Sequence, residues 1–380
     1  MSLDCGIVGL PNVGKSTIFT ALTAAPANAE NFPFCTIEPN VGIIDLPDER
    51  LSFLASVFEP KKVTPATVKF VDIAGLIKGA ALGEGLGNKF LANIREVTCI
   101  AHVVRCFENA DIMHVRESAN SEASIDPKAD IETINMELAV ADLDTIARRQ
   151  EKVTKMSRQL GKEEEKKWAS WTSAVEKIKP LLEAGKCARL ADLTLEEKNA
   201  VYDMFLLTMK PTFYVCNIDE ETLTSGTNKY VEVVKKIAEE EKSKMVVISG
   251  KFESDLSEIK DEAERKDFME VAGLKKSGLS NVARTAYNLM GLQTFFTGGE
   301  DECRAWTIHA GDTAPKAAGV IHTDFEKGFI KAEAYTIEDL RQYGSEAKIK
   351  EAGKYRIEGK EYVVQDGDVL FFKFNAAGAK

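Results

Sequence analysis

The chain has 380 residues, of which 44% are hydrophobic and 29% charged, and its formal net charge at pH 7 is −11. This length exceeds what one hydrophobic core usually organises, so we expect two or three domains. The composition is typical of a globular protein, and the negative charge argues against one that coats nucleic acids without sequence preference. The absence of a long apolar run and of a secretory signal pattern predicts a cytoplasmic protein without membrane contact.

The first predicted element is a short buried strand over residues 3–9, and a glycine-rich loop follows it. In this loop Gly9 and Gly14 are separated by four residues, and Lys15 and Ser16 come next, which is the P-loop pattern. Such a loop wraps a polyanion with its backbone amides, so it needs glycine where the backbone comes closest. We expect Lys15 to neutralise the β- and γ-phosphates and Ser16 to bind Mg²⁺, at the amino end of a helix. The residues expected to hold the nucleotide here are Asn12, Val13, Gly14, Lys15, Ser16 and Thr17.

Two later segments complete a triphosphate and metal site. In the loop at residues 31–39, Thr36 can bind Mg²⁺ through its hydroxyl and the γ-phosphate through its amide, although an ordinary surface threonine stays open as the alternative. A strand at 68–72 ends in the D-x-x-G pattern, in which Asp72 faces Mg²⁺ and the Gly75 amide senses the γ-phosphate. The four glycines between residues 76 and 87 predict a mobile loop that orders around the γ-phosphate.

The groups that position the attacking water are not the usual ones. Ras-like hydrolases carry a glutamine directly after the D-x-x-G glycine, whereas Leu76 has no polar atom for this role. Asn12 occupies the P-loop position at which similar enzymes help to hold K⁺, whose charge could replace an arginine finger. His114, in a polar loop after the strand at 101–107, could reach a water if the loop folded inward. An exposed loop histidine is the alternative that stays open.

Residues 130–182 have helical periodicity, with apolar side chains recurring at intervals of three and four. We expect two long helices that pack as an antiparallel hairpin inserted into the nucleotide domain. Trp168 and Trp171 are interpreted as packing residues. A solvated face and a contact with ribosomal RNA phosphates both stay open for the basic stripe on this segment. The stripe consists of Arg148, Arg149, Lys152, Lys155, Arg158 and Lys162.

The base-reading segment follows a strand at 213–217. GTPases read guanine with Asn-Lys-x-Asp, whose carboxylate accepts the N1–H and the exocyclic amine, but here Ile218 replaces the lysine and Glu220 the aspartate. A carboxylate repels the adenine N1 acceptor, whereas the Asn217 amide can pair with N7 and the six-position amine. A strand at 245–248 ends in Ser249-Gly250-Lys251, which resembles the Ser-Ala-Lys loop that closes the base pocket. We therefore expect ATP rather than GTP, with a degenerate GTPase as the alternative.

The remaining features concern the thiols and the end of the chain. The seven cysteines are scattered singly, which predicts buried reduced thiols rather than a zinc site. From residue 292 onward short strands alternate with Gly-Asp and Glu-Gly turns, which indicates a small mixed module of the β-grasp kind. The cysteines are Cys5, Cys35, Cys99, Cys106, Cys187, Cys216 and Cys303.

These residues together resemble the Obg-like ATPases, the YchF branch of the Obg-related P-loop proteins. The resemblance is carried by residues 9–17, 31–40, 72–76, 83–88 and 217–220. It implies an α/β fold: a Ras-like P-loop domain at 1–128 and 208–291, an inserted helical hairpin at 129–207, and a C-terminal α+β TGS domain at 292–376. It also implies a ribosome-binding ATPase of low intrinsic rate that converts ATP to ADP and phosphate, with backbone near Ile218 touching adenine.

A hypothesis of another class also stays open. In that hypothesis the nucleotide only sets a conformation that docks on ribosomes or client proteins, with negligible turnover. Leu76 predicts slow hydrolysis and is compatible with both hypotheses.

Overall fold

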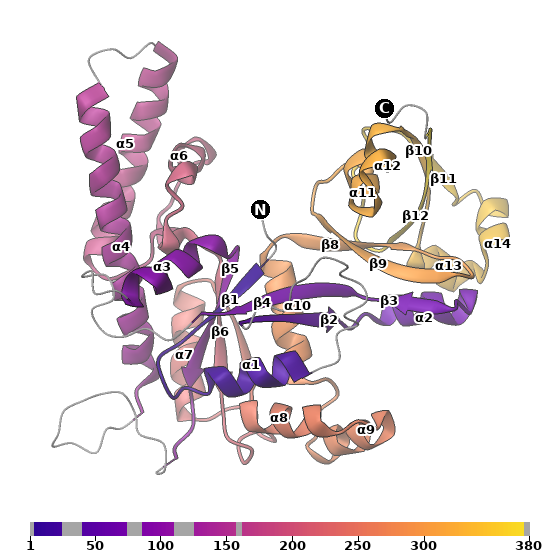
Figure 1. The fold of residues 1–380 in the computed structure, drawn as a ribbon, viewed down its shortest axis with the longest axis horizontal. Helices are drawn as coiled ribbons and strands as arrows, with labels where there is room; N and C mark the ends of the chain where they lie inside the picture. Colours follow the sequence, from indigo (N-terminus) through magenta and orange to yellow (C-terminus); the bar gives the residue numbers. More distant parts are fainter. Residues whose placement is uncertain (1–3, 25–39, 74–85, 110–124, 157–161, 376–380) are drawn as a thin grey trace. The chain divides into compact units, whose positions relative to one another are not determined.

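The computed structural model describes residues 4–24, 40–73, 86–109, 125–156 and 162–375 (Figure 1). The described chain separates into two compact units. Of the described residues, the first unit contains 4–24, 40–42 and those between 69 and 286, and the second contains 43–68 and 287–375. The domain ranges expected from the sequence stay a prediction, because these units follow contacts between residues rather than sequence motifs.

The first sheet has six strands in the order β2-β4-β1-β5-β6-β7. The pairs from β4 to β7 are all parallel, and every residue of β1, β5 and β6 is buried, as expected for strands covered on both faces. Because these strands are parallel, their carboxyl ends lie at one edge of the sheet, where ligands bind in such folds. The strands are β1 (Asp4–Val8), β2 (Val41–Leu46), β4 (Ala66–Asp72), β5 (Cys99–Arg105), β6 (Thr212–Asn217) and β7 (Lys244–Ile248).

Helices connect these strands in chain order, as a doubly wound sheet requires. The helix α1 follows β1 directly through the P-loop, and α8 begins where β7 ends. The helices of this part are α1 (Lys15–Ala24), α3 (Leu86–Glu96), α7 (Lys229–Glu240), α8 (Gly250–Glu258), α9 (Glu262–Val271) and α10 (Gly278–Leu289).

The predicted pair of long helices is present as α4 (Pro127–Met156) and α5 (Lys162–Glu183), which lie side by side in Figure 1. Trp171 is buried in the hydrophobic cluster that these two helices share with residues 188–206, which confirms its interpretation as a packing residue. Buried Asp142 of α4 accepts hydrogen bonds from the backbone N–H groups of Leu207 and Thr208, both at 2.8 Å. These bonds fasten α4 to the chain that returns to β6. The shorter elements here are η4 (Ala188–Leu190), α6 (Leu195–Val201), η5 (Tyr202–Met204) and η6 (Leu207–Met209).

The described part of the basic stripe is partly neutralised within the protein. Arg148 forms an ion pair with Asp144 at 2.6 Å, and Arg149 forms one with Asp203 at 2.7 Å. The side chains of Lys155, Arg158 and Lys162 lie outside the described part of the structure. Contact between this stripe and RNA phosphates therefore stays a prediction.

The second unit is built on a mixed sheet of six strands in the order β11-β10-β12-β8-β9-β3. Its strands are β3 (Lys62–Thr64), β8 (Leu292–Thr297), β9 (Glu302–His309), β10 (Phe329–Thr336), β11 (Arg356–Glu358) and β12 (Asp368–Phe374). Its helices are α2 (Glu49–Phe58), α11 (Ala314–Ile321), α12 (Thr323–Lys327), α13 (Ile337–Tyr343) and α14 (Glu346–Glu351). The edge strand β3 comes from early in the chain and pairs in parallel with β9.

The early segment 43–68 is held in the second unit by several contacts. The Thr64 hydroxyl donates to Glu302 Oε1 at 2.5 Å. Arg50 of α2 donates to Asp366 Oδ2 at 2.6 Å. A Cβ built on Gly298 would lie 3.0 Å from the Phe58 ring, which shows how closely α2 approaches β8 and β9. The sheet of the C-terminal module therefore includes residues far from it in sequence.

The described cysteines are all buried and free, which confirms their predicted burial, and Cys35 lies outside the described residues. Each helix in the described part of the chain is too short or too polar to span a lipid bilayer.

Candidate functional site

A cleft of about 940 Å³ lies at the carboxyl edge of the first sheet. Four segments line it: the P-loop with the start of α1, the loop after β5, the loop after β6, and the start of α8. The lining residues are Leu10, Pro11, Asn12, Gly14, Lys15, Ser16, Thr17, Phe107, Glu108, Asn109, Asn217, Ile218, Asp219, Glu220 and Lys251. The parallel strands thus bring together segments that are more than 200 residues apart in the chain.

Both P-loop glycines are required by packing, and Gly14 is required by its conformation as well. A Cβ on Gly14 would lie 2.1 Å from Asn217 Nδ2, and Gly14 has a φ of +88°. A Cβ on Gly9 would lie 2.8 Å from the Val103 carbonyl oxygen. Asn12 also has a positive φ, 64°, which asparagine tolerates better than most residues. The loop is therefore held in its shape by the neighbouring strands.

Lys15 and Asp72 meet at the phosphate end of the cleft. The Lys15 ammonium donates to Asp72 Oδ1, and only 9% of Lys15 is exposed. Lys15 begins α1, and Asp72 ends β4, next to β1 in the sheet. The structure thus brings the P-loop cation and the carboxylate of the D-x-x-G pattern together.

Asn217 connects the P-loop to the start of α8. Its Nδ2 donates to the Val13 carbonyl at 2.9 Å, and its Oδ1 accepts from the Gly250 N–H at 2.8 Å. These two bonds fix the orientation of the Asn217 amide. Asn217 as a whole is only 5% exposed. The residue is therefore a brace between loops, and its predicted pairing with adenine stays a prediction.

The residues that replace the guanine-reading lysine and aspartate have different environments. The Ile218 side chain is buried in the cluster between β6 and α7, and its N–H donates to the Ile248 carbonyl at 2.9 Å. Glu220 Oε2 lies 2.5 Å from Lys251 Nζ. The hydrogen bond that Lys251 donates to Glu220, together with the charge of that carboxylate, raises the pKa of Lys251. The carboxylate at the base end of the cleft is thus already paired within the protein.

Ser249 has a structural role in the described chain. Its hydroxyl accepts from the Phe252 N–H at 3.4 Å and caps the amino end of α8. The residue is 1% exposed. A direct contact between Ser249 and a nucleotide stays a prediction.

The loop after β5 lines the cleft with Phe107, Glu108 and Asn109, which were not among the site residues expected from the sequence. Arg105 donates to the carbonyl oxygens of Phe107 and Asn109, both at 3.2 Å, and its guanidinium lies 4.7 Å from the centre of the Phe107 ring. Burial lowers the pKa of Arg105. Lys229 Nζ, 2.8 Å from Glu108, holds the loop from the side of α7 and lowers the Glu108 pKa. Arg105, a basic residue at the end of the buried strand β5, was the one signal in the sequence for this loop arrangement.

Several predicted site residues lie outside the described part of the chain. These are Thr36, Gly75, Leu76 and His114. Their roles stay predictions.

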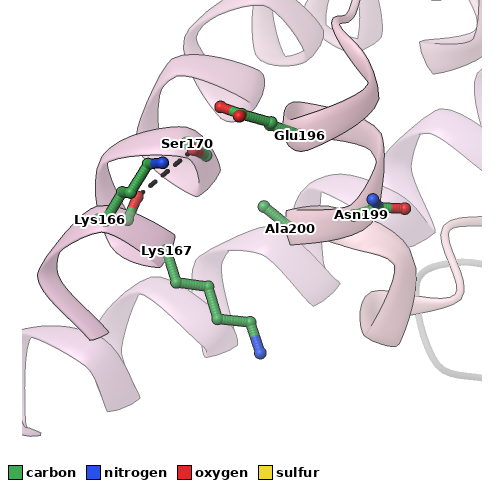
Figure 2. Close-up of a pocket in the computed structure, with 6 residues that line it drawn as sticks. All are labelled: Lys166, Lys167, Ser170, Glu196, Asn199 and Ala200. Atoms are coloured by element: carbon green, nitrogen blue, oxygen red, sulfur yellow. Dashed lines mark hydrogen bonds between the residues drawn. The ribbon is translucent and has the colours of Figure 1, made fainter. Parts of the chain in front are cut away.

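A second hollow of about 310 Å³ lies on the helical part, between α5 and α6 (Figure 2). Figure 2 shows that Lys167 and Glu196 do not point toward one another, and the hydrogen bond drawn there joins the Ser170 hydroxyl to the Lys166 carbonyl within one helix. The polar groups do not converge on a common point. The cleft at the sheet edge is therefore the candidate site.

A glycine loop between the first strand and its helix, with a lysine facing a carboxylate on the neighbouring strand, defines a P-loop nucleotide-binding protein. The family model described as a 50S ribosome-binding GTPase matches residues 4–141, and the model for the C-terminal part of YchF GTPases, described as a protein of unknown function, matches residues 292–375. The chain belongs to the YchF family, as its relatives over the full length show.

Curated relatives named "Ribosome-binding ATPase YchF" are similar along nearly the whole chain. The proteins of Pasteurella multocida and Escherichia coli O157:H7 are each 51% identical over 99% of this chain and 100% of their own length. The Bacillus subtilis protein is 47% identical over the same shares. The solved YchF GTPase of Schizosaccharomyces pombe has a TM-score of 0.87 at 38% identity, covering 98% of both chains. A GTP-binding protein of Pyrococcus horikoshii, with a TM-score of 0.59 at 16% identity, shares the fold.

Proposed function

We propose that this protein is a ribosome-binding ATPase that hydrolyses ATP to ADP and phosphate at the cleft on the first sheet. The observation that carries the proposal is the Glu220–Lys251 pair at the base end of a P-loop cleft, where a guanine-reading protein needs a free aspartate. The names of the bacterial relatives support ATP and the ribosome as partners. A GTPase is the second candidate, because the solved relative from Schizosaccharomyces pombe is named as one.

The donor set at the phosphate end fits Mg²⁺. Ser16 lines the cleft and the Asp72 carboxylate lies beside Lys15, and both side chains offer the hard oxygen ligands that Mg²⁺ prefers. Bound Mg²⁺ would neutralise charge on the β- and γ-phosphate oxygens. Thr36 is proposed as a further ligand.

Lys15 and the loop amides carry the protein's own share of the reaction. A triphosphate in the cleft attracts the Lys15 ammonium away from Asp72, which frees the carboxylate to face the cation. The ammonium and the P-loop amides then stabilise the charge that develops while water attacks the γ-phosphate in line. We propose that the Gly75 amide binds the γ-phosphate, that Asn12 helps to hold K⁺, and that His114 approaches the attacking water.

The same proposal extends to the setting of the protein. A ribosome-binding ATPase acts in the cytoplasm, where ribosomes translate. The C-terminal module, which resembles a TGS domain, is proposed as a docking surface rather than a catalytic one.

The substitution Lys15→Ala tests the phosphate site. We expect it to reduce multiple-turnover phosphate release from ATP by at least about a hundredfold, since it removes the charge that stabilises the transition state. Lys235→Ala on the exposed face of α7 is the matched control and leaves turnover unchanged. The assay is run with ATP and with GTP, in K⁺ and in Na⁺, with and without ribosomes.

Each arm of this assay decides one part of the proposal. Turnover retained in Lys15→Ala means that the phosphate site is elsewhere. Faster turnover or tighter binding of GTP favours the GTPase. Absence of turnover under every condition favours a nucleotide-regulated binding protein, and equal rates in K⁺ and Na⁺ remove the proposed role of Asn12.

A further inference from the structure

We propose that Lys251 is a specificity-determining residue that disfavours guanine by holding the Glu220 carboxylate in an ion pair. The inference rests on the proposed function and deepens it. It concerns the base end of the cleft, where both side chains line the wall and Lys251 Nζ lies 2.5 Å from Glu220 Oε2.

The backbone that carries Lys251 and the backbone that carries Glu220 are each held by hydrogen bonds, so the two side chains are placed next to one another. Lys251 is the second residue of α8, whose first N–H, that of Gly250, is bound by Asn217. Glu220 lies in a turn organised by Asp219, whose carboxylate accepts from the Thr222 N–H at 2.8 Å. The buried brace and this turn therefore place the ammonium beside the carboxylate before any ligand arrives.

The chemistry of the two purines makes this pairing selective. Guanine presents its N1–H and its exocyclic amine side by side, and a carboxylate reads them only if both oxygens are free to accept. In this protein Lys251 engages one oxygen of Glu220 and neutralises its charge. Adenine presents an acceptor at N1, which a free carboxylate would repel, so the same ammonium removes a penalty against adenine.

The size of the effect follows from exposure. The side chains of Lys251 and Glu220 are 72% and 40% exposed, and an exposed ion pair changes an affinity by about fivefold at most. Such a pair is screened by salt, because the Debye length falls from about 10 Å at 0.1 M to about 3 Å at 1 M. The ratio of ATP to GTP affinity isolates the base, since both ligands carry the same triphosphate.

The experiment measures the ATP to GTP and the ADP to GDP affinity ratios by titration calorimetry on the full chain. In Lys251→Gln we expect both ratios to fall about two- to fivefold at low salt, because Glu220 becomes free to accept from guanine. In the unaltered chain, high salt should lower the ratios toward those of Lys251→Gln. Lys251→Arg, which keeps the pair, retains the original ratios, and Lys260→Gln, just after α8, is the control for lost charge.

A double variant separates this mechanism from a general effect of charge. In a Glu220→Gln background there is no carboxylate to release, so we expect Lys251→Gln to leave the ratios unchanged. Unchanged ratios in Lys251→Gln while the unaltered chain prefers ATP would overturn the inference and leave the proposed function intact. An unaltered chain that prefers GTP would overturn both. A fall in the ratios that persists in the Glu220→Gln background would assign the selectivity to Lys251 alone. That result would also overturn the proposed role of the ion pair.

Discussion

At the scale of single residues, the site depends on one amide and one glycine in contact. Asn217 is bound to the P-loop carbonyl of Val13 and to the N–H at the start of α8, and Gly14 leaves the space that the amide occupies. A buried amide that loses such partners costs about 1–3 kcal/mol. The shape of the P-loop is therefore coupled to the residue that begins the base-reading segment.

This contact predicts a large effect of Gly14→Ala. The new Cβ would lie 2.1 Å from Asn217 Nδ2, so the amide must move and the loop with it. We expect ATP affinity, measured by titration calorimetry, to fall by more than about tenfold. Gly226→Ala is the matched control, because Gly226 also has a positive φ but no atom within 4 Å of its Cβ position. Equal affinities for the two variants would contradict the coupling.

The part of the site that sequence could predict is the part with local requirements. The P-loop was recognisable because glycine, lysine and serine must occur there at fixed spacing, and Asp72 because it ends a strand. Phe107 and Asn109 were not predicted, since they enter the cleft through backbone bonds to Arg105 that impose no residue type on them. Lys251 was noted only as part of a loop that resembles Ser-Ala-Lys, and its pairing was not predicted because its partner Glu220 lies 31 residues away.

At the scale of elements, Glu253 joins two helices through a buried carboxylate. It lies on α8 and accepts from the Gly278 N–H, at the amino end of α10, at 2.6 Å. Burial raises its pKa from the usual 4.5 to about 7, although the backbone bonds act in the opposite direction. The contact between α8 and α10 is therefore sensitive to pH near neutrality.

The raised pKa of Glu253 makes the stability of the fold depend on pH. A carboxyl whose pKa is raised on folding stabilises the fold fully below its unfolded value of 4.5, and that stability is lost as pH rises through about 7. Relative to Glu253→Gln, we expect the unaltered chain to lose about 3 kcal/mol of unfolding free energy between these limits. Urea unfolding at several pH values measures it. Glu258→Gln, at the exposed end of α8, is the control, and a constant difference between Glu253→Gln and the unaltered chain would refute the linkage.

The elements themselves differ in how well sequence revealed them. The strand at 213–217 and the long helices were predicted within a few residues, because buried strands and helical periodicity leave clear patterns. The pairing of β3 with β9 left no such pattern in the sequence. Lys-Val-Thr is too short to show alternation, and its partner lies about 240 residues away.

At the scale of the whole molecule, the C-terminal module extends beyond residues 292–375. Segment 43–68 supplies the edge strand β3 and the helix α2, including the Arg50–Asp366 bond. Without them, one edge of β9 would present unpaired backbone groups and the surface under α2 would be exposed. The sequence motifs of this segment, which lies between Thr36 and Asp72, gave no reason to assign it to the C-terminal part.

This arrangement predicts that the isolated module is incomplete. We expect a fragment of residues 287–375 to unfold at a lower temperature, or to aggregate, and a peptide of residues 43–64 to raise its melting temperature in circular dichroism. The same peptide with Arg50→Ala should help less, because it cannot bond Asp366. A fragment that melts cooperatively alone and does not respond to the peptide would show that the early segment is dispensable.

The division of residues between the units also bears on how the protein withstands proteolysis. In the described part of the structure, the backbone passes from one unit to the other after residues 42, 68 and 286. A single cut at any one of these junctions leaves the halves tethered by the others. A protease must therefore cut the chain at several of these junctions before either unit can diffuse away. A molecule that is cut once keeps its two units at high effective concentration.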